Sequence, residues 1–140
     1  RALEHYRTAY EPSEADPVPQ TILTMNVVVA ETAEEASRRA LPQARAFARL
    51  RSGRPMLATE TIEAALAAPD AVLDAAAATV AEQWIVDAPA GAADRIRSLA
   101  ATHGVDEVML SPSAGSYTDE PLDATPGRED TLRLLVAALD

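Results

Sequence analysis

The side chains best suited to bind a ligand lie in two places, within an apolar segment at 21–30 and just after another at 105–111. Asn26 is the amide inside the first segment, and Ser111, Ser113 and Tyr117 accompany the end of the second. Amide, hydroxyl and phenol groups can orient a small molecule through hydrogen bonds, so these four are candidate pocket-lining residues. The alternative is a plain polar loop after 111 and a purely structural hydrogen bond at Asn26.

The sequence identifies no catalytic residue. It has no phosphate loop, no GxGxxG pattern and no nucleophile elbow. There is no cysteine, and His5 and His103 are too far apart in sequence for a two-histidine metal motif, so we expect no metal site. Arg51 and Arg54 either lie on a solvated turn or reach an anionic ligand. Trp84 is either a core residue or a platform for a cofactor ring.

Charge and composition exclude several classes of partner. The 140 residues include 12 Lys and Arg against 22 Asp and Glu, a net charge of −10. This charge opposes binding to nucleic acid and to anionic membrane surfaces. No apolar run approaches the roughly 20 residues of a membrane span, so we expect a soluble, cytoplasmic protein. Alanine supplies 31 residues, so the core is thinner than the hydrophobic content of 48% suggests.

The clearest elements are a strand over 21–30 and the helix that follows it. Both alternating sets of the strand contain apolar residues, which predicts burial on both faces. We expect Val27 and Val29 to pack under the next helix. That helix should begin at the capping box Thr32-Ala33-Glu34-Glu35 and carry an apolar stripe from Ala33 to Leu50. Pro42 should kink or split it.

The rest of the chain alternates helices with short extended segments. We expect helices near 60–67 and, capped by Asp70, over 71–82, then a very short strand or link at 83–86. Pro89 should open a helix over 90–102, before the strand at 105–111. A closing helix over 129–139 should bury one apolar side, formed by Leu132, Leu135, Val136 and Leu139. The pattern is of the βαβ type and predicts parallel strands joined by crossover helices.

Four segments, taken in order and spacing, resemble the luciferase-like monooxygenase family, in particular its small LLM class oxidoreductases. They are ALEHYRTAYEPS at 2–13, MNVVVAETAEEASRRA at 25–40, FARLRSGRP at 47–55 and WIVDAPAGAADRIRSLAATHGVDEVMLSPS at 84–113. One departure is Asp87-Ala88-Pro89-Ala90, where the family usually shows Gly-Ser-Pro-Glu. Asp87 is then expected to act as the N-cap and to repel any anion at this turn.

The resemblance implies a flavin-dependent enzyme built on a (β/α)8 TIM barrel, of which residues 1–140 form a single segment at the C-terminal end. The segment would hold two main parallel strands. The parent enzyme would use reduced flavin, FMN or F420, and O2 to oxidise a small organic substrate. In such a barrel Ser111, Ser113 and Tyr117 follow a strand at the active-site face.

On its own, the segment is expected to lack activity and to bind no flavin tightly, because a barrel site is assembled from the loops after many strands. A chain with unpaired strand edges and thin helices should also form a homo-oligomer. The other interpretation is a stand-alone α/β binding or interaction module without catalysis. The sequence does not distinguish FMN from F420 and does not identify the substrate.

Overall fold

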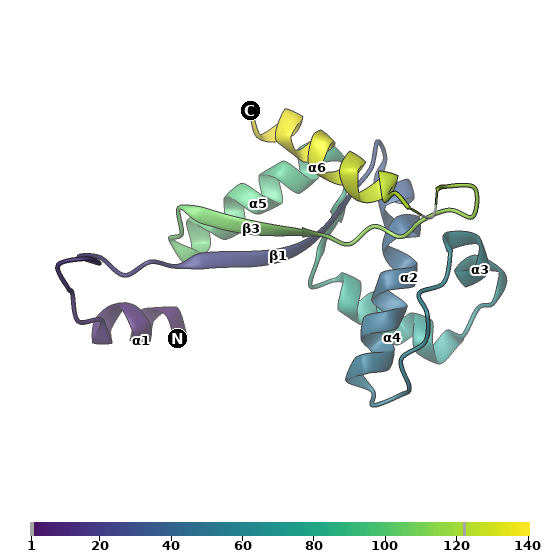
Figure 1. Ribbon diagram of the computed structural model, residues 1–140, viewed down its shortest axis with the longest axis horizontal. Helices are drawn as coiled ribbons and strands as arrows, with labels where there is room; N and C mark the ends of the chain where they lie inside the picture. Colours follow the sequence, from purple (N-terminus) through teal and green to yellow (C-terminus); the bar gives the residue numbers. More distant parts are fainter. Residues whose placement is uncertain (1, 122) are drawn as a thin grey trace.

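The computed structural model describes residues 2–121 and 123–140, which form an α/β fold. The α/β class predicted from the sequence is confirmed. Its elements, shown in Figure 1, have these bounds: α1 Ala2–Ala9, β1 Ile22–Val29, α2 Ala33–Arg51, α3 Ile62–Ala67, α4 Ala71–Ala81, β2 Ile85–Asp87, α5 Pro89–His103, β3 Glu107–Pro112 and α6 Pro126–Leu139.

The strands form one parallel sheet in the order β2-β1-β3. β1 pairs with all of β3, from Ile22 opposite Glu107 to Val27 opposite Pro112. On its other side β1 pairs with β2 only over Val27–Val29, so the edge of residues 22–26 stays open there among the described residues. The short strand predicted at 83–86 is therefore present, shifted to Ile85–Asp87.

Helices α5 and α6 cover one face of the sheet. In Figure 1 they lie along β1 and β3, whereas α2, α3 and α4 gather at the far end of the strands. Val27 and Val29 pack in a cluster with Ile96 of α5 and Leu135 of α6. Val28, on the opposite face of β1, packs with the α2 alanines. The prediction that Val27 and Val29 pack under α2 is therefore wrong. Side chains alternate between the two faces of a strand, and it is Val28 that faces α2.

The other face of the sheet is uncovered along most of its length. Its residues come from alternate positions of the two paired strands: Ile22, Thr24, Asn26, Glu107, Met109 and Ser111. Ile22 is 49% exposed and Met109 is 55% exposed. The prediction that β1 is buried on both faces holds only for Val27–Val29. A parallel sheet normally has both faces covered, which makes this open face the most unusual feature of the fold.

Helix α2 begins where the capping box predicts. The hydroxyl of Thr32 accepts a hydrogen bond from the backbone N–H of Glu35 at 3.2 Å. Pro42 lies inside this helix, which runs unbroken to Arg51, so the predicted split does not occur. Arg45, only 3% exposed, joins α2 to its neighbours through Asp74 at 2.6 Å and Glu60 at 3.1 Å.

Helix α6 buries only part of the predicted apolar side, because Leu135 is buried and Leu139 packs against the same cluster, whereas Leu132 and Val136 do not. Its buried residues are Gly127, Thr131 and Leu135, while Leu132 and Val136 are 41% and 60% exposed. β3 ends at Pro112, opposite Val27, so Val29 has no β3 residue beside it. The Thr131 hydroxyl lies 3.1 Å from both the N and the O of Val29 and takes the missing partner's place. Because the buried N–H and C=O groups of Val29 need hydrogen-bond partners, Thr131 faces the sheet.

Within the described residues, no helix is both long and apolar enough to cross a membrane.

Candidate functional site

Three of the four predicted pocket residues lie together where β1 pairs with β3. Asn26 and Ser111 are partners across the two strands. The hydroxyl of Ser113 lies 3.4 Å from Oδ1 of Asn26 and 3.2 Å from the backbone O of Ser111. Ser113 is buried, Asn26 is half-buried and Ser111 is exposed. Asn26 and Ser111 therefore remain accessible on the open sheet face, whereas Ser113 contacts both of them from a buried position.

Tyr117, in the loop after β3, lies apart from this group and packs beside the first turn of α2. Its hydroxyl donates to the carboxylate of Glu35, with the two oxygens at 2.9 and 2.7 Å. The guanidinium of Arg39 lies over the Tyr117 ring, 4.8 Å from its centroid. Burial raises the pKa of Tyr117, and the hydrogen bond and charge of Glu35 raise it further. The phenol therefore stays protonated and serves as a donor.

Arg39 is the centre of this group, which we call the Arg39 cluster: Glu35, Arg39, Tyr117 and Glu120. Arg39 lies 2.9 Å from a carboxylate oxygen of Glu35 and 2.9 Å from one of Glu120. Burial lowers the pKa of Arg39, but the hydrogen bonds and charges of Glu120 and Glu35 outweigh it, so the pKa rises. The cluster holds loop 113–120 against α2. The spacing of Glu35 and Arg39, one helical turn apart, was the available signal in the sequence.

A small cavity of about 140 Å³ adjoins the Arg39 cluster. Its lining combines two arginines with three acidic residues: Val29, Ala30, Glu31, Glu35, Arg39, Asp130, Arg133 and Leu134. Ligand pockets for drug-sized molecules have about 300 Å³ or more. The cavity is therefore too small for a three-ring flavin, and its acidic lining opposes a phosphate.

A negative side chain from the end of β2 lies beside the first turn of α5, at the place where anions usually bind. The N-cap is Ala88, without a side-chain cap, so the prediction of Asp87 as the N-cap is wrong. Asp87 instead accepts a hydrogen bond from the N–H of Ala88 at 2.7 Å. A methyl group built on Gly91 would overlap the Asp87 carboxylate, which therefore lies over this turn. Its negative charge lies beside the helix N-terminus and leaves little room for an anionic ligand.

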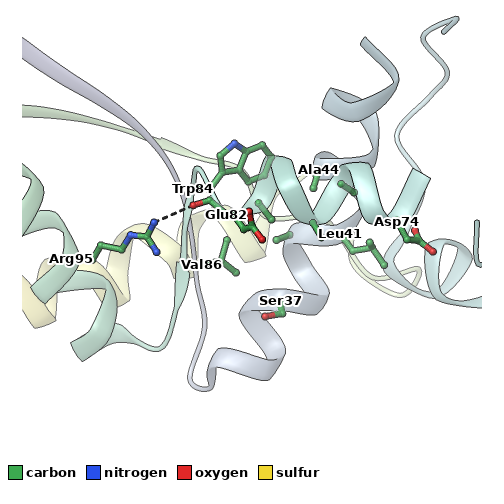
Figure 2. A pocket seen from close by; sticks show the side chains of 12 residues that line it. Ser37, Leu41, Ala44, Asp74, Glu82, Trp84, Val86 and Arg95 are labelled. Carbon is green, nitrogen blue, oxygen red and sulfur yellow. Dashed lines mark hydrogen bonds between the residues drawn. The ribbon is translucent and has the colours of Figure 1, made fainter. Parts of the chain in front are cut away.

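Another cavity, of about 420 Å³, lies between α2 and α4 and is shown in Figure 2. Its lining is mostly small and apolar, with acidic residues and one arginine at the margins: Ser37, Ala40, Leu41, Ala44, Asp74, Ala77, Ala78, Ala81, Glu82, Trp84, Val86 and Arg95. Trp84 is 2% exposed and packs edge-on against Phe47, with the ring centroids 5.4 Å apart. Its position agrees with the core interpretation.

The remaining candidates of the sequence are placed as follows. Arg54 lies 4.0 Å from Asp70, and Arg51 donates to the side-chain oxygen of Gln83. His5 is exposed on α1, and His103 is exposed at the end of α5. Among the described residues, no group of three or more His, Cys, Asp or Glu is placed to hold a metal ion.

Comparisons with known proteins inform the fold and not the activity. No family model matches the sequence, and a search of curated proteins finds no match. Among solved structures, the chain is similar to the crystal structure of apo-MsnO8, with a TM-score of 0.74 and 23% sequence identity. The likeness covers 99% of this chain but 40% of that chain. The protein therefore shares its fold with about two fifths of apo-MsnO8.

Proposed function

We propose that this chain is the C-terminal portion of a luciferase-like flavin-dependent monooxygenase. The parent enzyme uses reduced flavin and O2 to oxidise a small organic substrate. The 140 residues alone do not carry that activity, and they act in the parent by completing one side of a barrel. The proposal rests on the resemblance of four sequence segments and on one structural observation.

That observation is the uncovered face of the β1–β3 sheet. Leu23, Met25 and Val27 point to the helix-covered side, whereas Ile22, Thr24 and Asn26 are exposed or half-buried. Apolar residues on an open sheet face, such as Met109 at 55% exposure, cost free energy in water. In a (β/α)8 barrel, one face of every strand points into the packed interior and the other is covered by helices. A strand pair taken from a barrel would have such an open face, and this supports the proposal.

The strand order also suits this proposal if β1 and β3 are neighbouring barrel strands. They pair over six residues, as parallel neighbours do, while β2 has three residues. β2 then belongs to the long connection between the two barrel strands, together with α2, α3, α4 and α5. The comparison with apo-MsnO8 supports a larger parent, because nearly the whole chain matches 40% of that structure.

The residues of this chain supply only part of a flavin site. When bound, reduced flavin supplies the electrons that activate O2. Asn26 and Ser111 can orient a ligand on the sheet face, but this face is open and the small cavity beside the Arg39 cluster does not enclose a three-ring system. Asp87 and the Arg39 cluster oppose a phosphate at the strand ends. The phosphate would therefore be bound by other parts of the parent.

The test uses the longest protein encoded by the uninterrupted reading frame that includes this chain. Supplied with reduced FMN or F420 and O2, it should transfer oxygen to members of a panel of small organic substrates, measured by mass spectrometry with labelled O2. Asn26→Ala and Ser111→Ala should lower the yield, whereas Ser98→Ala, at an exposed position of α5, should not. A frame that contains no further strands and helices, or no flavin-dependent oxidation, would favour the stand-alone binding module.

A further inference from the structure

A second cavity, of about 270 Å³, lies beside the open edge of β1. It is lined by four consecutive strand residues together with residues of α2, α5 and the segment before β2: Leu23, Thr24, Met25, Asn26, Arg51, Gln83, Trp84, Ile85, Arg95, Leu99 and His103. None of these residues is acidic. In a chain of net charge −10, a cavity whose charged residues are arginines is a local exception.

The two arginines of this cavity are each anchored by a hydrogen bond to the segment before β2. Arg51, the last residue of α2, donates from Nη2 to Oε1 of Gln83 at 3.0 Å. Arg95, on α5, donates from Nη2 to the backbone O of Glu82 at 3.1 Å (Figure 2). Because Glu82 and Gln83 are adjacent in the chain, the two guanidinium groups are anchored at neighbouring points. Both acceptors are neutral, so neither hydrogen bond cancels a positive charge.

This lack of neutralisation distinguishes them from most other arginines that the structure describes. Six arginines have a carboxylate oxygen within 4.0 Å: Arg38, Arg39, Arg45, Arg54, Arg97 and Arg133. No such contact is found for Arg51 or Arg95 within residues 2–121 and 123–140. Glu82 directs its carboxylate to the neighbouring cavity between α2 and α4. Two unneutralised guanidinium groups that line one cavity favour an anion there.

The rest of the cavity sets the size and character of the ligand. Leu23, Leu99 and Ile85 provide an apolar wall, and the volume is near the lower end for ligand pockets, about 300 Å³. Asn26 and His103 add polar groups at the margin. This combination suits a single-ring molecule that carries one acidic group.

We propose that this cavity binds a small organic anion, with its carboxylate or phosphate group between Arg51 and Arg95 and its ring against the apolar wall. The site adjoins the first half of β1 and the last turn of α5, at the end of the sheet opposite loop 113–120. It shares Asn26 with the candidate site on the sheet face, but it lies away from the strand ends at which a barrel enzyme binds its cofactor. The proposal does not depend on the flavin-dependent activity.

The test is a titration of the purified 140-residue chain with phenyl phosphate, benzoate, inorganic phosphate and neutral benzyl alcohol. Trp84, the only tryptophan in the sequence, lines the cavity and reports binding through its fluorescence. The two aromatic anions should give saturable changes, and the stronger of them identifies phosphate or carboxylate as the preferred group. Inorganic phosphate should bind more weakly, and benzyl alcohol should give no saturation.

Variants locate the site. Arg51→Gln and Arg95→Gln should each weaken binding by about tenfold or more, the loss expected for one charge-assisted contact. Arg95→Lys keeps the positive charge but not the forked donors of the guanidinium, so its affinity should lie between those of wild type and Arg95→Gln. Arg38→Gln on the exposed side of α2 should leave the affinity unchanged. Circular dichroism of each variant checks that the fold is retained.

Three results would overturn the proposal. One is the absence of saturation by either aromatic anion with the folded wild-type chain. Another is an equal loss of affinity in Arg38→Gln, which would indicate a general effect of net charge. The third is binding of an acidic extended peptide along β1 without binding of the small anions, which would make the cavity an edge for strand addition.

Discussion

The hydroxyl of Tyr117 donates to both carboxylate oxygens of Glu35, 2.7 and 2.9 Å away, although the residues are 82 positions apart in the sequence. The contact connects the loop after β3 to the first turn of α2. Arg39 contacts both residues: its guanidinium lies over the Tyr117 ring and 2.9 Å from a carboxylate oxygen of Glu35. The position of the loop at the strand ends therefore depends on this polar cluster together with the packing of Ala114 in the core.

Removal of the Tyr117 hydroxyl should loosen this loop without unfolding the protein. Tyr117→Phe keeps the ring under Arg39 but leaves Glu35 without its phenol donor. Because the group is partly exposed, we expect a loss of about 1 kcal/mol in the free energy of unfolding, at the low end for a hydrogen bond to a charged group. Urea unfolding measures this loss, and Tyr6→Phe on the exposed side of α1 is the control. Equal stability of Tyr117→Phe and wild type would contradict a role for the contact.

The N-cap of α4 should contribute to the loss of stability in acid. The carboxylate of Asp70 accepts from the N–H of Leu73 at 3.0 Å and of Val72 at 3.2 Å. The hydrogen bond from Leu73, and after it those from Val72 and the charge of Arg54, hold the pKa of Asp70 below its usual value, against the opposing effect of burial. A lowered folded-state pKa gives stability above the unfolded pKa, and that stability is lost as the pH falls through the folded value.

Asp70→Asn isolates this contribution. Asparagine is also a good N-cap but does not titrate, so the variant should lose less stability than wild type between about pH 5 and about pH 2. The melting temperature measured across this range provides the comparison. The same acid dependence in both proteins would show that other carboxylates, such as Glu63 with its lowered pKa, account for the effect.

The buried half of β1 should not tolerate a charge. Val27 is fully buried, so Val27→Asp would place an unpaired carboxylate in the cluster under α5 and α6. We expect a loss of about 3 to 5 kcal/mol or outright unfolding. Thr24→Asp, on the same strand but on the exposed face, should change the melting temperature little. A melting temperature unaffected by Val27→Asp would contradict the placement of this residue.

Helix starts were predictable because their signals are local. Thr32 with Glu35, and Asp70 with Val72 and Leu73, lie within one helical turn and form the predicted caps. Pro42 does not split α2 as predicted. The free energy that a proline costs a helix is local, whereas packing over the whole of α2 stabilises the helix around it.

Orientation was not predictable from apolar spacing alone. Val28 and Val27 are equally apolar, and only the tertiary arrangement decides which of them contacts α2. On α6, apolar spacing favoured Leu132, Leu135, Val136 and Leu139, of which Leu132 and Val136 are exposed. The buried side is instead set by the hydrogen bonds of Thr131 to Val29, at 3.1 Å, and by the small Gly127. A polar residue that completes a strand edge has no signature in a hydrophobic pattern.

The candidate site was predictable to the extent that strand pairing determined it. Asn26, Ser111 and Ser113 come together because β1 and β3 are parallel neighbours in register. The position of Tyr117 depends on the path of the loop after β3, and no residue pattern in the sequence predicts that path. Arg95 was not singled out from the sequence, because its significance depends on Arg51, a residue 44 positions earlier that only the fold brings near it.

The open sheet face and strand edge predict self-association of the chain. Ile22 and Met109, 49% and 55% exposed, lie on this face beside the unpaired edge of β1. We expect a dimer or higher oligomer at micromolar concentration, measured by light scattering. Met109→Lys should shift the population toward the monomer, whereas Val72→Lys on α4, another exposed apolar position, should not. A compact monomer of the wild-type chain would contradict this prediction.

The most direct test of the central claim is the affinity for flavin of two proteins, the 140-residue chain and the longest product of its reading frame. FMN and F420 are titrated into each, and flavin fluorescence is measured. The account predicts a dissociation constant at or below about 1 μM, worth roughly 8 kcal/mol, for one flavin with the longer protein, and no saturable tight binding by the chain alone. Binding at that strength by the chain alone, or no binding of either flavin by the longer protein, would contradict it.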